Sequence, residues 1–505
     1  MAITAIETEL KYDVPDDAAL PELDQLPAVA QTRQEADEQL EAEYYDTDDF
    51  RLIRAGITLR RRRGGHDEGW HLKIPADAHS RREISVPLAD DVTVPAELAD
   101  QVKVHTRGKA LRPRATITTS RKRVILIDEA GAPLAELAVD EVHATQRTRA
   151  RTQSSWREVE LELTGGDRQV LDSADQLLLR SGLRRSVSSA KFERVVGAER
   201  DALPGRVNLS PASPASDVVL AYLADHAEAL KSLDPMVRRD EPDAVHQMRV
   251  ATRRMRSTLQ TFGRLIWTAD TSHLAAELKW LGGLLGQARD AEVIAGHLLA
   301  SLSDVEPELV IGPVTRRVHG HFDPAGAKAS DVARRTLSSR RYFALLDELD
   351  TLLREPGLTP DAGQPARALL PGAARRAYRR TRKRMRAARQ SPAGQSNEIA
   401  LHEARKAAKR ARYAAELLTP ALGKDPRRFA RRMKQIQTLL GDHQDSVIAR
   451  QVELDLAKGA ARAGENAFTY GVLYQRDAEA AGQARAKAAK AWKRATKPAV
   501  LAWLA

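Results

Sequence analysis

Residues 202–216, ALPGRVNLSPASPAS, divide the sequence into two parts with different residue patterns. This segment is rich in proline and serine and holds one charged residue, which is typical of a domain boundary. Before it, apolar and polar residues alternate with the period of a strand; after it, apolar residues recur with the period of a helix. The pattern predicts an α+β protein with one domain at 1–201, a linker at 202–215 and an all-helical domain at 216–505.

Charge is divided at the same place. Residues 1–205 hold 30 Lys and Arg against 37 Asp and Glu, a net charge of −7, whereas residues 206–505 hold 50 against 32, a net charge of +18. A helical body this basic indicates an acidic partner.

Cysteine is absent, which excludes disulfides, thiol nucleophiles and thiolate metal sites. The first residues, MAITAIETEL, do not resemble a signal peptide, and no apolar run approaches the ~20 residues that cross a membrane. We therefore expect a soluble, cytoplasmic protein.

Eight segments of the first part have the alternation of strands and are separated by Gly, Pro and Asp. With helical stretches near 48–55 and 167–181, they predict a closed or nearly closed antiparallel barrel. The segments are ITAIETELKY (3–12), EAEYYDT (41–47), GITLRRRR (56–63), GWHLKIP (69–75), RREISVP (81–87), ATITTSRKR (115–123), PLAELAVDEV (133–142) and SWREVELEL (155–163).

Carboxylates share one face of the first and the last of these strands. Glu7, Glu9 and Lys11 alternate with apolar residues, as do Glu158, Glu160 and Glu162. Like charges on one strand repel unless cations lie opposite. Two interpretations remain open here. The charges form a lumen that holds a divalent metal and a polyphosphate, or they form a solvated face in which Glu and Arg pair across strands.

Ordered motifs over about 1–200 resemble the CYTH family, the triphosphate tunnel metalloenzymes. The motifs are IETELKY (6–12), YYDT (44–47), LRRRR (59–63), HLKIP (71–75), LRP followed by Arg121, LAVDE (137–141), EVELEL (158–163) and SSAK (188–191). The resemblance implies an eight-stranded tunnel that binds a triphosphate-containing substrate together with Mg²⁺ or Mn²⁺. It also implies metal-assisted hydrolysis, the activity of a triphosphatase; adenylyl cyclases belong to the same family.

The resemblance assigns roles by position. It implies metal-side carboxylates at Glu7, Glu9, Glu158, Glu160, Glu162 and Asp140, and phosphate ligands at Lys11, Arg60, Arg62, Lys73, Arg121, Arg123 and Lys191. Among these, Glu9 and Lys11 are the expected catalytic residues. Strand parity alone does not separate Arg60 and Arg62 from Arg61 and Arg63, so the family pattern decides that pair.

An internal repeat organises the helical part. AVHQMRVATRRMRS at 244–257 matches ALHEARKAAKRARY at 400–413 with an offset of 156, and LKWLGGLLGQARDAEV at 278–293 matches MKQIQTLLGDHQDSVI at 433–448 with an offset of 155. The nearly constant spacing predicts two copies of one helical unit, at about 216–353 and 366–505, packed about a pseudo-twofold axis.

Each copy carries a narrow cationic stripe. At 100° per residue, the members of each stripe fall within a sector of about 80°. The stripes are His246, Arg249, Arg253 and Arg256; His402, Arg405, Lys409 and Arg412; and, on a third helix, Arg375, Arg379, Arg382 and Arg386. An exposed solubilising face is the alternative, but the repetition favours a bound polyanion. Few aromatic residues accompany the stripes, which disfavours nucleic acid, and a membrane surface fits less well because the apolar faces are needed for the core.

The helical segments resemble the CHAD family, the conserved-histidine α-helical domain. The resemblance rests on VHQMRVATRRMR, LKWLGGLLGQARD, SSRRYFALLDEL (338–349), LHEARKAAKRARY and MKQIQTLLGDHQD. It implies two four-helix bundles around a basic surface that binds inorganic polyphosphate. Together, the two resemblances predict a polyphosphate-binding protein with a phosphohydrolase tunnel. The alternatives are a non-catalytic scaffold that binds polyphosphate and a tunnel with cyclase-like activity. We expect the protein in the cytoplasm, associated with polyphosphate granules.

Overall fold

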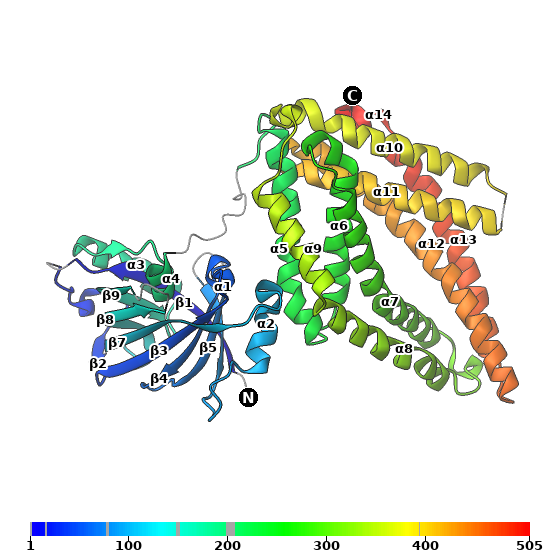
Figure 1. Ribbon diagram of the computed structural model, residues 1–505. Coiled ribbons are helices and arrows are strands. Elements are labelled where there is room, and N and C mark those ends of the chain that lie inside the picture. Colours follow the sequence, from blue (N-terminus) through cyan, green and yellow to red (C-terminus); the bar gives the residue numbers. More distant parts are fainter. Residues whose placement is uncertain are drawn as a thin grey trace. The chain divides into compact units, whose positions relative to one another are not determined.

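The computed structural model describes residues 3–15, 18–76, 80–147, 152–197, 208–392 and 394–504, apart from the side chains of 287–291. The chain forms two compact units, Met1–Ala202 and Leu203–Ala505, shown in blue to teal and in green to red in Figure 1. Residues 202–207 of the expected linker lie outside the described residues.

The first unit is a closed antiparallel barrel. Its eight strands follow the order β1-β6-β5-β4-β3-β7-β8-β9, and β9 pairs again with β1, with Lys11 opposite Glu160. The strands are β1 (Ile3–Asp13), β3 (Glu38–Asp46), β4 (Thr58–Arg63), β5 (Gly69–Pro75), β6 (Ser80–Val86), β7 (Arg112–Ile127), β8 (Pro133–Gln146) and β9 (Gln153–Leu163). Two short strands, β2 (Gln31–Gln34) on β7 and β10 (Arg184–Arg185) on β1, extend it. The predicted barrel is confirmed.

The helices that flank the barrel in the described part of this unit (Figure 1) are α1 (Arg51–Arg54), α2 (Ala96–Thr106), α3 (Arg168–Arg180) and α4 (Lys191–Val196). The carboxylate of Asp167 caps α3 by accepting from the backbone N–H of Gln169 at 2.8 Å. Helices α1 and α3 fall in the two stretches predicted to be helical, whereas the sequence pattern did not predict α2 or α4. A short 3₁₀ turn spans Leu23–Gln25.

The apolar core of this unit lies outside the barrel wall. Leu10, Tyr12 and Leu161 point outward from β1 and β9 and pack in one cluster with Leu171 and Leu178 of α3. Because successive side chains of a strand point to opposite faces, the charged residues between them point into the lumen. The sequence can therefore bury its apolar face against helices and leave the interior polar.

The second unit is all-helical and contains the repeat (Figure 1). The first copy consists of α5 (Ala215–Arg238), α6 (Ala244–Ile266), α7 (Ser272–Ser303) and α8 (Val314–Leu337), followed by α9 (Arg340–Arg354). The second consists of α10 (Ala366–Gln390), α11 (Gln395–Leu422), α12 (Lys424–Arg462) and α13 (Phe468–Ala495), followed by α14 (Pro498–Leu501). Short 3₁₀ turns lie at Pro307–Leu309, Pro360–Gly363 and Ala502–Leu504.

Two contacts between α6 and α11 are related by the repeat. Arg254 Nη2 donates to Glu416 Oε2 at 3.2 Å, and Arg410 Nη2 donates to Gln260 Oε1 at 2.8 Å. Adding the offset of 156 to the first copy's residues converts one pair into the other. This exchange is what a pseudo-twofold axis between α6 and α11 produces.

The two copies also share part of their core. Leu298 of α7 and Phe322 of α8 belong to one buried cluster with Leu456 of α12 and Tyr470 of α13. The four-helix sets are therefore joined rather than separate. Within the described residues, none of these helices has the length and apolar character needed to cross a membrane.

Candidate phosphate and metal site

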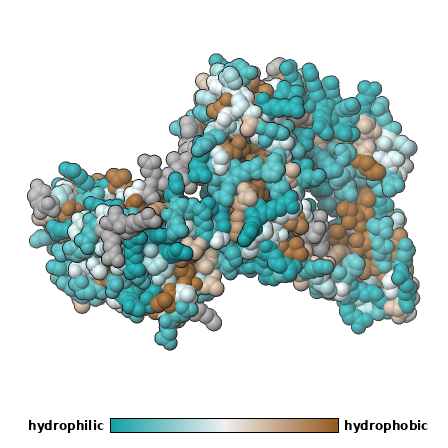
Figure 2. Space-filling view, in the orientation of Figure 1, coloured by the Kyte–Doolittle hydropathy of each residue, from teal (hydrophilic) through white to brown (hydrophobic). Residues whose placement is uncertain are grey.

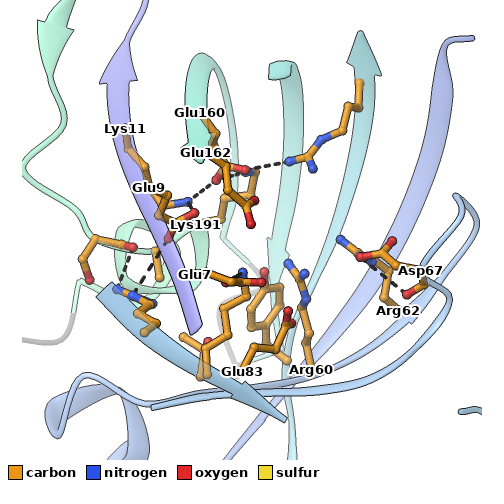
Figure 3. A pocket seen from close by; sticks show the side chains of 17 residues that line it. Glu7, Glu9, Lys11, Arg60, Arg62, Asp67, Glu83, Glu160, Glu162 and Lys191 are labelled. Atoms are coloured by element: carbon orange, nitrogen blue, oxygen red, sulfur yellow. Dashed lines mark hydrogen bonds and ion pairs between the residues drawn. The ribbon is translucent and has the colours of Figure 1, made fainter. Parts of the chain in front are cut away.

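The barrel holds a cavity lined by charged side chains (Figure 3). Seven basic and six acidic residues face it, and Ala190 is its one apolar lining residue within the described part of the chain. The lining residues are Glu7, Glu9, Lys11, Tyr44, Thr58, Arg60, Arg62, Asp67, Lys73, Arg81, Glu83, Arg121, Glu160, Glu162, Ser189, Ala190 and Lys191.

Lys11 bridges two carboxylates on neighbouring strands. Its ammonium lies 3.2 Å from Glu9 Oε2 and contacts Glu160 across the β1–β9 seam (Figure 3). Burial opposes ionisation of Glu160, but the charges of Lys11, Lys191 and Arg121 outweigh it and hold the pKa of this carboxyl well below its usual range. The cations around Glu160 therefore favour its ionised form in the lumen.

Asp140, Glu158 and Glu160 form an acidic triad whose ligand atoms lie within 4.8 Å of one another and could hold a metal ion. The ammonium of Lys191 sits among them, at 2.8, 2.7 and 2.8 Å from one oxygen of each. Arg121 adds a bidentate pair with Asp140, at 2.8 and 2.7 Å. In this arrangement the protein's own cations neutralise the triad.

A second acidic group lies around Glu7. Lys73 Nζ is 2.5 Å from Glu7 Oε2, and burial together with a hydrogen bond shared with Glu83 raises the pKa of Glu7 to about 8. His71 orients Glu83, because its Nδ1 lies 2.8 Å from Glu83 Oε1 and its Nε2 lies 2.8 Å from the backbone oxygen of Asp67. His71 itself does not line the cavity.

Glu162 lacks a cation of its own. It points into the cavity on the side of Glu7 (Figure 3), and within the described ranges no ion pair or hydrogen bond is recorded for it. Burial raises the pKa of Glu162, with Lys73 opposing and the charges of Glu9 and Glu160 reinforcing the shift. Oxygen donors with too little positive charge around them fit a hard divalent cation such as Mg²⁺ or Mn²⁺.

Most of the predicted lumen residues meet in this cavity. Arg60 and Arg62 line it, whereas Arg61 and Arg63 do not. The pair of arginines at the cavity is therefore the pair that the family pattern implied. Asp140 and Glu158 lie behind the lining and reach the cavity through Lys191. The lining residues expected from sequence are Glu7, Glu9, Lys11, Arg60, Arg62, Lys73, Arg121, Glu160, Glu162 and Lys191.

Arg123 lies apart from the cavity. Its guanidinium pairs with Glu38 at 3.1 Å and with Glu136 at 3.2 Å, and it is not among the residues that line this cavity. Arg123 lies two residues after Arg121 and so faces the same side of β7. Because β7 is 16 residues long, Arg123 can lie farther along the barrel than Arg121 does. Arg123 therefore has carboxylate partners of its own on β3 and β8, and its role as a phosphate ligand stays a prediction.

Sequence reasoning missed Arg81 and Glu83 of β6. Arg81 donates to the backbone oxygen of Ser189 at 2.8 Å and lies 3.9 Å from Glu9. Both residues share one strand face in RREISVP, and this parity was the available signal. The other lining residues that were not expected are Tyr44, Thr58, Asp67, Ser189 and Ala190.

In the helical unit, the stripes of α6 and α11 face each other. We call Arg249, Arg253, Arg405 and Lys409 the basic face. Burial, and then the charges of Arg405, Arg253 and Arg249, lower the pKa of Lys409 to about 7, so these four side chains are close together. All four are only half-buried, and the Nε atoms of Arg253 and Arg405 are buried without hydrogen-bond partners.

Other stripe members have different surroundings. Arg412 donates to Glu416 at 2.6 Å and to Gln437 at 3.1 Å, so part of its charge is neutralised. Burial lowers the pKa of Arg410, and the nearby charges of Arg380 and Arg256 lower it further. Arg256 therefore lies close to Arg410. His246 and His402 are half-buried at the start of the two stripes.

The third stripe, on α10, lies on a separate flank. Arg375, Arg379, Arg382 and Arg386 are all exposed. Arg384 approaches α11 instead, with Nη2 3.9 Å from Glu403 Oε2, and it lies on the other side of α10 from this stripe. Figure 2 shows hydrophilic colour over the α10 region.

Comparison with protein-family models matches a CYTH domain to residues 5–192 and a CHAD domain to residues 221–452. Two uncharacterised proteins from two strains of Mycobacterium tuberculosis, MT2285 and Rv2226, are each 39% identical over 500 residues, which is 95% of this chain and 94% of the relative.

Solved structures include PptA from Streptomyces chartreusis, which is 23% identical, covers 56% of this chain and 100% of its own, and has a TM-score of 0.48. The CHAD domain from the plant Ricinus communis is 24% identical, covers 59% of this chain and 94% of its own, and has a TM-score of 0.42. The CYTH match precedes the CHAD match along the chain, and the relatives align over almost the whole of it. The chain belongs to the family of proteins in which a CYTH tunnel domain is followed by a CHAD domain.

Proposed function

We propose that the barrel is a metal-dependent phosphohydrolase for the end of a triphosphate or polyphosphate chain. The observation that carries this proposal is the lumen itself, in which seven cations and six carboxylates converge on one cavity. A phosphate chain supplies negative charge to the cations, and a divalent metal supplies positive charge to the carboxylates. Together the two ligands would replace ion pairs that the lumen side chains now make with each other, such as Lys73 with Glu7 and Lys11 with Glu160.

The carboxylates least compensated by cations would hold the metal. These are Glu7 of β1 and Glu162 of β9, whose pKa values are raised, with the acidic triad as a second candidate. Glu9 of β1 would join them, although burial there is outweighed by the charges of Lys11, Lys73 and Arg81, which already lower its pKa. A bound Mg²⁺ or Mn²⁺ supplies charge neutralisation of the phosphates and a bound water of lowered pKa. The CYTH family is metal-dependent, which supports this assignment.

The cations would hold and orient the phosphates. Arg60, Arg62 and Lys73 project from β4 and β5, opposite Lys11 and the β9 carboxylates. Guanidinium groups bind phosphate oxygens with two parallel hydrogen bonds, which fixes the direction of the chain as well as its position. Glu9 would then act beside the metal, with Lys11 neutralising charge between Glu9 and Glu160.

Cyclase-like activity has less support from the lining. Tyr44 is the one aromatic residue among those that line the cavity in the described chain, and its ring already stacks on Phe192 with centroids 5.1 Å apart. An adenine base therefore lacks a free aromatic surface there, whereas a bare phosphate chain needs none.

We propose further that the helical unit holds long-chain inorganic polyphosphate on the basic face. Its cations are crowded and half-buried, so they repel one another until a polyanion binds. The nearby aromatic rings are already in use: Arg254 and Arg412 lie over Tyr413, and Tyr378 stacks on Trp492. Nucleic acid would lack stacking partners on this surface.

Two assays of the full chain test these proposals. Incubation with tripolyphosphate and a series of longer chains, with and without Mg²⁺ or Mn²⁺, should release inorganic phosphate only when metal is present; no release from any chain would contradict the hydrolase. In a competition assay at matched salt and equal phosphate concentration, RNA or DNA should fail to displace bound polyphosphate. Displacement by either would contradict the preference for a phosphate polymer.

A further inference from the structure

Two glycines of the helical unit lie directly beneath two arginines of the basic face. A Cβ added to Gly286 of α7 would stand 3.1 Å from Arg249 Nη2, 3.2 Å from its Cζ and 3.4 Å from its Nε. A Cβ added to Gly441 of α12 would stand 3.0, 3.3 and 3.4 Å from the same atoms of Arg405. The nearly equal distances to three atoms mean that each guanidinium lies broadside against the helix.

The two contacts are copies of one another. Arg249 and Arg405 are 156 residues apart, and Gly286 and Gly441 are 155 apart, which are the two offsets of the repeat. The same contact therefore occurs on both sides of the pseudo-twofold axis, in segments where many other residues differ between the copies.

Backbone geometry does not explain these glycines. Both are buried inside long helices, and neither is among the residues with a positive φ. Glycine in a helix interior destabilises a protein relative to alanine. The presence of glycine at both positions therefore needs another explanation. The guanidinium lies so close to each helix that a larger side chain at Gly286 or Gly441 would press against it.

The contact also restrains where the guanidinium points. Arg405 Nη1 lies 3.8 Å from Asp445 Oδ1 of α12, so the group is held by the glycine surface on one side and by a carboxylate on another. The charge interactions of Lys409 place both restrained arginines beside Lys409 and Arg253. Two guanidiniums restrained in this way lose less conformational freedom when they bind phosphate.

We propose that Gly286 and Gly441 are positioning residues that orient Arg249 and Arg405 as a symmetric pair of phosphate ligands on the basic face. The inference rests on the proposed binding of polyphosphate by the helical unit. A methyl group at either position requires the flexible guanidinium to shift by a few tenths of an ångström. Because alanine favours the helix, we expect the effect to fall on binding and not on folding.

Alanine substitutions in the full chain test this inference. Gly286→Ala and Gly441→Ala should each weaken binding of long-chain polyphosphate about tenfold, the loss expected for one charged hydrogen-bonding contact. Each variant should also show a thermal midpoint equal to or above that of the unsubstituted protein, because alanine favours the helix. Gly283→Ala on α7 is the matched control, since an added Cβ there meets nothing within 4 Å.

A double-mutant cycle separates positioning from a general structural effect. In an Arg405→Ala background, Gly441→Ala should have no further effect on affinity, because the group it displaces is gone. Equal losses in both backgrounds, or unchanged affinity of Gly441→Ala, would overturn the positioning role. If the unsubstituted chain does not bind polyphosphate, the proposed function fails and this role fails with it, so the two failures are distinguished by the unsubstituted protein.

Discussion

The ammonium of Lys191 lies 2.7 Å from Glu158 Oε1, at the centre of the acidic triad. Lys191 is almost fully buried and is also 2.8 Å from Asp140 Oδ2. One cation of the chain thus fills a place that a metal ion could take, and it also lines the cavity that we propose as the phosphate site. Metal and phosphate binding can therefore be linked through a single side chain.

Lys191→Met should destabilise the protein by about 3–5 kcal/mol without divalent metal, because buried carboxylates lose their counterion. Mg²⁺ or Mn²⁺ should then restore part of the lost stability, since the triad is free to bind the ion. Thermal unfolding with and without metal measures both effects. A variant as stable as the unsubstituted protein in metal-free buffer, or one that metal leaves unchanged, would contradict this view of Lys191.

Arg121→Lys should lower the rate of phosphate release at least tenfold, because a lysine cannot reproduce the bidentate geometry that Arg121 makes with Asp140. Arg123→Lys is the matched control on the same strand, and it should retain the rate because Arg123 pairs with Glu38 and Glu136 away from the cavity. Initial rates of phosphate release from tripolyphosphate make the comparison. Equal losses in the two variants would mean that Arg123 also contacts substrate.

Polyphosphate binding should weaken as the pH rises from 6 to 8.5. Burial, followed by the charges of Arg405, Arg253 and Arg249, places the pKa of Lys409 at about 7 in the free protein. Below this pKa the amine of Lys409 is charged and attracts the polyanion. Above it the amine is neutral in the free protein and must take up a proton when the polyanion binds, which weakens binding. Lys409→Arg keeps the charge at every pH, so it should flatten the dependence of Kd on pH. An unchanged slope in this variant would exclude Lys409 as the source.

Glu453→Gln should stabilise the protein at pH 8 relative to the unsubstituted chain and have little effect at pH 5. Glu453 of α12 is fully buried, and burial together with the neighbouring Asp477 raises its pKa to about 8. A carboxyl whose pKa is raised by folding contributes most to the free energy of unfolding at a pH below its pKa in the unfolded chain. That contribution is lost as the pH rises toward 8. Denaturant unfolding across this range tests the sign, with the exposed Glu479→Gln as control; parallel pH profiles for the two variants would contradict it.

The sequence predicted the elements whose residues follow a regular period. Strand alternation identified the eight strands of the barrel and the inward face of β1. Successive side chains of a strand point to opposite faces, so the alternation tells which face each residue occupies. Parity alone could not choose between Arg60 and Arg61, and it placed Arg123 with Arg121 although only Arg121 reaches the cavity. The position of a residue along a tilted strand depends on barrel closure, which a period does not describe.

Contacts between distant segments were beyond the reach of the sequence patterns. The stripe on α10 has the same angular spacing as those on α6 and α11, yet only the latter two approach each other, because helix packing decides which faces meet. The glycines beneath Arg249 and Arg405 appear in the repeat as matched letters, but their steric role depends on the approach of α6 to α7 and of α11 to α12.

Phosphate release and polyphosphate binding, measured on the same preparation of a Glu7→Gln, Glu9→Gln double variant, test the central claim most directly. The unsubstituted full chain should release inorganic phosphate from tripolyphosphate in the presence of Mg²⁺ or Mn²⁺, and the double variant should lose this release while it binds long-chain polyphosphate with unchanged affinity. If the double variant releases phosphate at the rate of the unsubstituted protein, or if neither protein releases any, the barrel is not a hydrolase that works through these carboxylates, and the account of the tunnel is wrong.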